Sequence, residues 1–306
     1  MGRLSLVSCS DPVQPPPAGR LGELVSALAA AGYDPDAEAI RELGADGWRR
    51  DPRRRAGMLN RAFADPGVEA VVDVSGGDLA NEVLSYLDWG TIAANPKPVV
   101  GYSDLTCVLN AIVARTGRTA VLWNAMAGLH RGFGVLDAAL AGETIRPALA
   151  GADGDADAFE ALPWLGGNLR CFLKLAGTRY WPDLAGGVLL VESLGASLKA
   201  LAAGLDGAAS RQGQDEVLVL TGGHGQGLPR SERHHAQGGP LPAGPLRGEV
   251  QLVAVVGELA GADDVAGLVR RLGLGGAVGV AHGGAPSAPG GTRGDCLVWG
   301  GPAGAD

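Results

Sequence analysis

Residues 68–78 read VEAVVDVSGGD, and this stretch shows how the chain alternates its elements. β-branched side chains dominate its first seven positions, as in a buried strand, and Ser75, Gly76 and Gly77 then end the run with a sharp corner. A helical pattern over residues 79–87 follows. A strand that ends in a glycine-rich corner and continues as a helix is the unit from which parallel sheets are built.

The same unit recurs along the first half of the chain. A strand pattern at 97–102 leads into a helical pattern at 105–115, and a strand at 4–8 precedes an amphipathic helix at 19–31. A further strand is expected at 121–123. These patterns predict an α/β fold in which helices cover both faces of a parallel sheet.

The second half of the chain has its own strand patterns, at 187–192, 250–256 and 277–281. Residues 151–163 are rich in Ala, Gly and Asp, so we predict that they link a domain at 1–150 to a second domain at 164–306. Residues 221–248 are rich in Gly and Pro and interrupt the strand pattern as a long irregular excursion.

Composition excludes several classes of protein. The 306 residues are 46% apolar, enough for a sizeable core, and the formal net charge of -8 argues against nucleic acid or anionic lipid as a partner. No apolar run is long enough to span a membrane, and the N-terminal residues lack the pattern of a signal peptide, so we expect a soluble cytoplasmic protein. The four cysteines form no CxxC pair, which disfavours a zinc site.

Candidate chemical groups stand directly after the predicted strands, where parallel α/β sheets bind their ligands. Ser103, Glu192 and His282 each end a different strand. The corner before Ser103 has the geometry of a nucleophile elbow, but Leu105 replaces the second glycine of the G-x-S-x-G pattern, so the spacing alone favours a helix cap at Ser103 or Asp104. His282 is open to a structural or a catalytic role. The basic triplet 53–55 is predicted to lie on the exposed face of a helix.

Taken together, these motifs resemble the LD-carboxypeptidase family of serine peptidases, which includes muramoyl-tetrapeptide carboxypeptidases and microcin C self-immunity peptidases. Five ordered motifs at compatible spacing carry the resemblance over most of the chain. They are RAFADPGVEAV with SGG (61–71, 75–77), PKPVVGYSDLT (96–106), GGNL with GTRYWPDL (166–169, 177–184), LLVE (189–192) and HG (282–283).

The resemblance implies a Ser-Glu-His triad. Ser103 would be the nucleophile, His282 the general base and then the general acid, and Glu192 the carboxylate that orients the imidazole. The backbone N–H groups of Gly77 and Asp104 would form the oxyanion hole. The implied fold is a flavodoxin-like N-terminal domain with a smaller C-terminal α/β domain, assembled as a homodimer. The resemblance implies neither a metal nor a cofactor.

The chain also departs from the family pattern near the expected cleft. Residues 123–126 read WNAM where the family usually has a His-Gly-Pro segment, and Gly77 is followed by Asp-Leu rather than by the commoner aromatic residue and glycine. The expected activity is hydrolysis of a C-terminal amide bond in a small peptide or peptide conjugate, as in murein recycling. Two alternatives stay open: a peptidase for natural-product processing or self-immunity, and a non-catalytic homologue that binds a peptide or glycopeptide.

Overall fold

The computed structural model divides into two compact units, which are described separately below. The first comprises Met1–Ile145 and Cys296–Ala303, and the second comprises Arg146–Asp295 and Gly304–Asp306. The structure describes residues 2–11, 19–43, 51–143, 164–184, 188–192, 218–220 and 297–299.

The first unit is built on one sheet whose strands follow the order β2-β1-β3-β4-β5-β9. Five neighbouring strands run parallel, and β9 pairs antiparallel with β5 at the edge. The strands are β1 (Arg3–Val7), β2 (Asp34–Asp36), β3 (Ala70–Asp73), β4 (Val99–Gly101), β5 (Ala120–Leu122) and β9 (Leu297–Trp299). The order 2-1-3-4-5 is that of a flavodoxin-like sheet, which confirms the predicted fold class.

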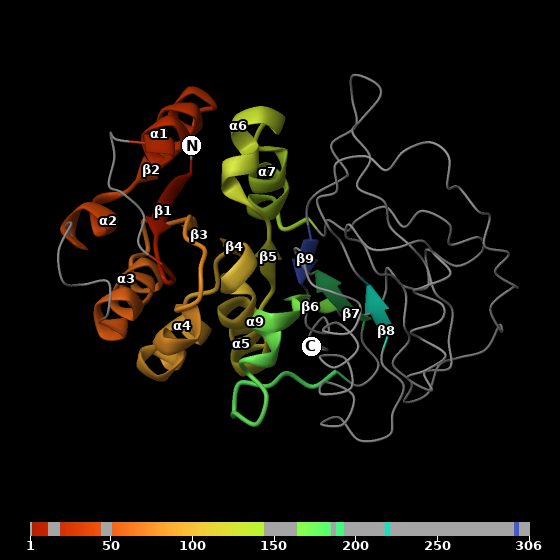
Figure 1. Ribbon diagram of the computed structural model, residues 1–306. Coiled ribbons are helices and arrows are strands. Elements are labelled where there is room, and N and C mark those ends of the chain that lie inside the picture. Colours follow the sequence, from red (N-terminus) through yellow and green to blue (C-terminus); the bar gives the residue numbers. More distant parts are fainter. Residues whose placement is uncertain are drawn as a thin grey trace, which may run out of the picture. The chain divides into compact units, whose positions relative to one another are not determined.

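Helices cover both faces of this sheet (Figure 1). Contacts group α1 with α6 on one face, and α3, α4 and α5 on the other. The helical elements are α1 (Gly19–Ala30), α2 (Glu38–Leu43), α3 (Pro52–Ala64), η2 (Ala80–Tyr86), α4 (Trp89–Ala94), η3 (Ser103–Leu105), α5 (Thr106–Thr116), η4 (Ala125–Ala127), α6 (Gly128–Arg131) and α7 (Gly134–Leu140). Leu24 and Leu28 of α1 pack on Leu6, Val72 and Val100 of the strands to form the core.

Local signals account for the ends of the longer helices. The Asp51 side chain accepts a hydrogen bond from the Arg53 amide at the start of α3, and Pro52 occupies the first turn, where no amide donor is needed. Helix α5 ends at Gly117, whose φ of 65° is left-handed and favours glycine. The start of α3 and the end of α5 are therefore determined by local residues.

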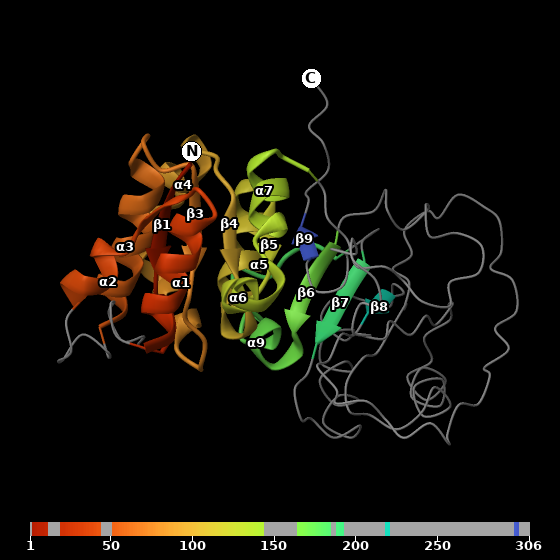
Figure 2. The ribbon, with the colours of Figure 1, turned by 90° about the horizontal axis from the view of Figure 1, so that it is seen from above.

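The second unit contains a parallel three-stranded sheet of β6 (Trp164–Asn168), β7 (Val188–Glu192) and β8 (Leu218–Leu220), in that order (Figure 2). Helix α9 (Leu169–Leu173) follows β6, and the Asn168 side chain caps it by accepting from the Cys171 amide. Gly166 has a φ of 102°, and a Cβ there would lie 2.0 Å from the Leu190 carbonyl oxygen. Only glycine therefore allows β6 and β7 to pair at this point.

The structure differs from the predicted domain division at β9, and several predicted segments lie outside the described residues. The sequence assigns all of 164–306 to the second domain, whereas β9, which comes from that range, pairs with β5 in the first unit. The predicted linker at 151–163 and the excursion at 221–248 lie outside the described residues, as do the strands expected at 250–256 and 277–281.

Candidate active site

The carboxyl ends of β1, β3 and β4 bring three loops of the first unit together. Strand order reverses between β1 and β3, and ligands of such sheets bind beside this reversal. Residues 8–11 follow β1, residues 74–79 follow β3, and Ser103 lies two residues beyond β4. Of the predicted site residues, Gly77, Ser103 and Asp104 therefore share one edge of one sheet.

The other two predicted site residues belong to the second unit. Glu192 is the last residue of β7, where its backbone pairs with that of Asn168. His282 lies outside the described residues.

Ser103 adopts a backbone conformation that L-residues avoid. Its φ is 55°, and among the residues that the structure describes it is the single non-glycine residue with positive φ. For a side chain with a Cβ this conformation costs roughly 1–2 kcal/mol, and such strain clusters at active sites. Neither η3 nor α5 receives a side-chain cap hydrogen bond at its N-cap residue. The conformation is that of a nucleophile elbow, which turns a serine hydroxyl away from the strand.

Gly101 explains how so sharp a corner forms without the usual second glycine. A Cβ on Gly101 would lie 2.8 Å from the Leu105 Cβ, closer than real Cβ contacts. The close approach therefore occurs between residues 101 and 105, and a glycine at 101 alone provides the space. Leu105, which replaces the second glycine of the G-x-S-x-G pattern, is therefore compatible with the corner.

The Asp104 carboxylate joins the corner after β4 to both neighbouring loops. Its Oδ2 accepts hydrogen bonds from the Ser10 hydroxyl at 2.6 Å and from the Ala80 amide at 2.7 Å. Ser10 and Asp104 are both fully buried. Because buried polar groups are costly unless they are paired, these bonds fix the three loops relative to one another.

A second buried carboxylate, Asp73, lies at the end of β3. Its Oδ1 accepts from the Ser75 hydroxyl at 2.5 Å and from the Ser75 amide at 2.8 Å, while its Oδ2 accepts from the Cys9 amide at 2.8 Å. Burial raises the pKa of Asp73 to about 6, although the hydrogen bonds from Ser75 and Cys9 act in the opposite direction. Burial likewise raises the pKa of the Cys9 thiol, and the nearby Asp73 charge adds to that shift.

Arg55 corrects one sequence prediction. The triplet 53–55 is predicted to be solvent-exposed, but the Arg55 side chain is fully buried. Its guanidinium donates to the Cys9 carbonyl at 2.7 Å and to the Leu79 carbonyl at 3.0 Å, and it pairs with Glu82. Arg55 thus joins the loop after β1 to the start of η2. Its neighbours in sequence do not identify these partners, because the partners come from distant loops.

Gly77 occupies a position that no other residue can take without strain. Its φ is 128°, and a Cβ there would lie 2.1 Å from the Asp11 Cγ. The loop is closed by a hydrogen bond from the Asp11 amide to the Gly76 carbonyl at 3.1 Å. In the part of the chain that the structure describes, the Gly77 amide has no hydrogen-bond acceptor and the Ser103 hydroxyl has no partner.

Residues 123 and 124, which differ from the family pattern, have structural roles. Trp123 is buried in the core and its ring packs edge-on against Phe133 at 6.4 Å. The Asn124 side chain caps η4 by accepting from the Met126 amide at 3.0 Å.

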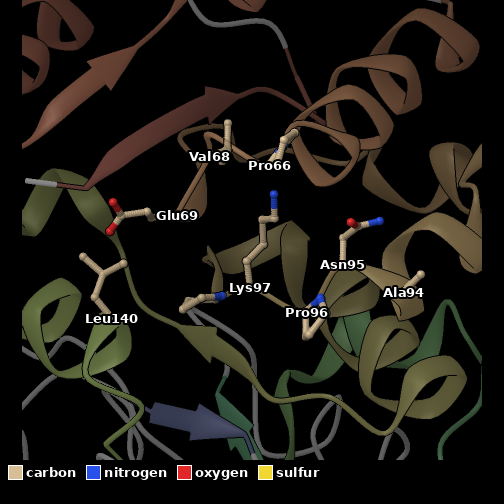
Figure 3. Close-up of a pocket in the computed structure, with 9 residues that line it drawn as sticks. Pro66, Val68, Glu69, Ala94, Asn95, Pro96, Lys97 and Leu140 are labelled. Carbon is tan, nitrogen blue, oxygen red and sulfur yellow. The ribbon is translucent and has the colours of Figure 1, made fainter.

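A separate cavity of about 470 Å³ lies at the opposite, amino-terminal edge of the same sheet (Figure 3). Its lining residues precede β3 and β4 or come from α4 and α7: Pro66, Val68, Glu69, Ala94, Asn95, Pro96, Lys97, Pro98 and Leu140. The Lys97 ammonium donates to the Ala62 and Asp65 carbonyls at the end of α3. The cavity lies away from the corner that holds Ser103, so we do not assign the site to it.

Comparisons with known proteins place the chain in a family. A model of the LD-carboxypeptidase N-terminal domain matches residues 4–122, and a model of the LD-carboxypeptidase C-terminal domain matches residues 163–224. The chain belongs to the LD-carboxypeptidase family. This confirms the family that the sequence motifs resemble.

Individual relatives are distant and match in part. A Treponema pallidum protein is 30% identical over 167 residues, which is 45% of this chain and 49% of that protein. The microcin C7 self-immunity protein MccF of Escherichia coli is 40% identical over 65 residues, 21% of this chain and 19% of MccF. The murein tetrapeptide carboxypeptidase of Pseudomonas aeruginosa is 41% identical over 54 residues, 17% and 18% of the two chains. The chain therefore spans half or less of the length of these relatives.

Solved structures share the fold at low sequence identity. The muramoyltetrapeptide carboxypeptidase of Oxalobacter formigenes has a TM-score of 0.66 at 18% identity, over 97% of this chain and 92% of the other. MccF in complex with glutamyl sulfamoyl guanosine has a TM-score of 0.66 at 17% identity, over 98% and 91%.

Two kinds of feature are absent from the described residues. None of their helices is long and apolar enough to cross a membrane. Within the same residues, no group of three or more His, Cys, Asp or Glu side chains is arranged to hold a metal ion.

Proposed function

We propose that the protein is a serine hydrolase that cleaves a C-terminal amide bond of a small peptide or peptide conjugate through an acyl-enzyme at Ser103. The observation that carries the proposal is the positive φ of Ser103 at the corner between β4 and α5. Strain of this kind persists only where surrounding contacts hold it. Here Gly101 leaves space for Leu105, and the buried Asp104 carboxylate is held by the Ser10 hydroxyl. Membership of the LD-carboxypeptidase family supports the same assignment.

The proposed reaction combines Ser103 with two groups from the second half of the sequence. His282 takes the proton of the Ser103 hydroxyl as the oxygen attacks the scissile carbonyl carbon, and Glu192 orients the imidazole and stabilises its charged form. The C–N bond then breaks, and His282 returns the proton to the leaving amine. Water then takes the place of the amine, and His282 accepts a proton from it as its oxygen attacks the acyl carbon. The C–O bond to Ser103 breaks and His282 returns the proton, which releases the carboxylic acid and regenerates the Ser103 hydroxyl.

The tetrahedral intermediate carries a negative charge on the former carbonyl oxygen. We assign its stabilisation to the N–H groups of Gly77 and Asp104, from the loops after β3 and β4. An oxyanion donor of this kind typically contributes about 3 kcal/mol to lowering the barrier. The positive φ of Gly77, the close approach of the Asp11 side chain and the hydrogen bond from the Asp11 amide to the Gly76 carbonyl support this role, because they hold a backbone amide in one orientation.

Two substrate classes follow from the relatives. The murein tetrapeptide carboxypeptidase of Pseudomonas aeruginosa suggests an L,D-linked murein peptide. MccF, which occurs in a structure with glutamyl sulfamoyl guanosine, suggests an aminoacyl group joined to a nucleotide-like group. Both present a carbonyl beside a removable terminal group, so both are compatible with an acyl-enzyme mechanism.

The test incubates the full chain with an L,D-murein tetrapeptide and, separately, with an aminoacyl sulfamoyl adenosine. Mass spectrometry then detects the released terminal group. We expect cleavage of one class, and Ser103→Ala should lower kcat by several orders of magnitude while the circular dichroism spectrum stays unchanged. An unchanged rate in Ser103→Ala would contradict the nucleophile, and binding of both substrates without cleavage would favour a binding protein.

A further inference from the structure

The two proposed oxyanion donors belong to different loops, so their separation depends on how these loops are held together. Gly77 lies after β3, and Asp104 lies after β4. The direct hydrogen bond between the two loops runs from the Ala80 amide to the Asp104 carboxylate at 2.7 Å. A third loop, after β1, contributes the Ser10 hydroxyl to the same carboxylate oxygen.

Ser10 joins these loops through its hydroxyl and its backbone amide. Its hydroxyl donates to Asp104 Oδ2 at 2.6 Å and accepts from the Leu79 amide at 3.3 Å, while its own amide donates to the Ser75 hydroxyl at 2.9 Å. The side chain is fully buried. A hydroxyl that donates on one side and accepts on the other has its proton direction fixed.

We propose that Ser10 is a positioning residue for the hydrolysis proposed above, on which this inference rests. By holding the Leu79 amide and the Asp104 carboxylate to one oxygen, Ser10 sets the distance between the Gly77 and Asp104 amides. Misplacement of such groups by about 1 Å costs on the order of a hundredfold in rate. Because the effect concerns charge that develops in the transition state, it lowers kcat and leaves KM nearly unchanged.

Ser8 provides a matched control in the same loop. It is also fully buried, but among the described residues its hydroxyl donates to the Asp11 carbonyl of its own loop, at 3.3 Å. Ser8→Ala removes the same atom as Ser10→Ala and disturbs packing in the same loop, yet it leaves the bonds to Leu79 and Asp104 in place. A role in folding alone would predict similar consequences for the two variants.

The test compares Ser10→Ala with Ser8→Ala in the full chain. Steady-state kinetics use whichever substrate the wild type cleaves, hydrogen exchange follows the amides of residues 76–80, and thermal unfolding confirms folding. We expect Ser10→Ala to lose about ten- to a hundredfold in kcat with KM within about twofold. Its Leu79 and Ala80 amides should exchange faster, whereas Ser8→Ala should match the wild type in both measurements.

Equal kcat values in the two variants would overturn the inference. If Ser10→Ala does not fold, Ser10→Cys replaces it, since the thiol, which is larger than the hydroxyl, leaves no cavity and donates a weaker hydrogen bond. A wild type that cleaves neither substrate would contradict the proposed function instead. In that case unchanged exchange at Leu79 and Ala80 in the Ser10 variant would still overturn the link between the loops.

Discussion

Polar groups are buried at one edge of the first unit's sheet and partly exposed at the other. At the carboxyl edge, Ser10, Asp73 and Asp104 are buried and bonded to one another's loops. At the amino edge, Arg3 bridges Asp36 and Asp65 with all three side chains between a quarter and two-fifths exposed. Exposed ion pairs of this kind contribute at most about 1 kcal/mol each.

The proposed function accounts for this difference, because it places the features that cost stability at the edge that holds Ser103. The carboxyl edge contains a strained serine and a buried carboxylate whose pKa is raised, and each of these features costs folding free energy. The amino edge contains hydrogen bonds that end a helix and ion pairs in contact with water. We therefore expect substitutions at the carboxyl edge to change activity, and those at the amino edge to change stability alone.

The largest effect is expected from Gly77→Ala. The new Cβ would overlap the Asp11 carboxyl group, and alanine avoids a φ of 128°. We expect kcat to fall at least about a hundredfold, because the loop that carries an oxyanion donor must move, and stability to fall by about 2–4 kcal/mol. Enzyme kinetics and urea unfolding measure the two effects.

Gly76→Ala is the control for this variant. A Cβ at Gly76 would meet no atom within 4 Å, and its φ is not positive. We expect its kcat to stay within a few-fold of the wild type and its stability to change by less than about 1 kcal/mol. If Gly77→Ala retains as much activity as Gly76→Ala, the assignment of an oxyanion donor to Gly77 is wrong.

The strands and corners of the carboxyl edge could be predicted because their sequence signals are local. The β-branched run before Ser75 and the glycine before the Ser103 corner lie within a few residues of the structure that they specify. Family resemblance added the topology, which periodicity alone does not specify. The antiparallel pairing of β9 with β5 was not predicted, because no strand was expected at 297–299 and a run of three residues does not indicate which sheet it joins.

The buried network could not be predicted for a different reason. Ser10, Asp73 and Arg55 become neighbours only when β1 and β3 lie side by side and α3 packs near them. Nothing in the sequence separates buried Arg55 from Arg53 and Arg54, apart from its place on the helix face that also buries Leu59 and Ala62. That spacing is the one signal that would have indicated burial.

A smaller effect is expected from Asp73→Asn, and it depends on pH. The folded-state pKa of Asp73 is raised to about 6 by burial, against about 3.9 in an unfolded chain. Between these values the folded protein binds more protons than the unfolded chain. Its stability therefore falls as pH rises from about 4 to about 6, by up to about 3 kcal/mol in total. Asparagine does not titrate, so this fall should be absent from the variant.

Urea unfolding at pH values from 4 to 7 measures this effect as the difference between the wild type and Asp73→Asn. The subtraction removes other carboxyls such as Asp65 and Asp88, whose pKa values are lowered by hydrogen bonds from backbone amides and which are present in both proteins. Asparagine also places an amide donor near the Ser75 and Cys9 donors, which shifts stability equally at every pH. A difference that is constant with pH would contradict the raised pKa.

The smallest effect is expected from Lys97→Met at the amino edge. Lys97 donates to the Ala62 carbonyl at 3.0 Å and to the Asp65 carbonyl at 2.7 Å, and desolvation lowers its pKa. Methionine keeps most of the side-chain volume but leaves both carbonyls without this donor, so we expect a loss of about 1–2 kcal/mol. Arg41→Met is the control, because it breaks an exposed pair with Glu38 that contributes less than about 0.5 kcal/mol.

The kinetics of Lys97→Met test the comparison between the edges directly. Lys97 lies two residues before β4 and Ser103 two residues beyond it, so a short strand of three residues separates the two edges. If the edges are independent, the melting temperature falls while kcat and KM stay at wild-type values, because the buried bonds around Asp104 hold Ser103 in place. A loss of kcat at temperatures where Lys97→Met is fully folded would mean instead that β4 transmits displacement along its length. The carboxyl edge would then depend on the amino edge for its geometry.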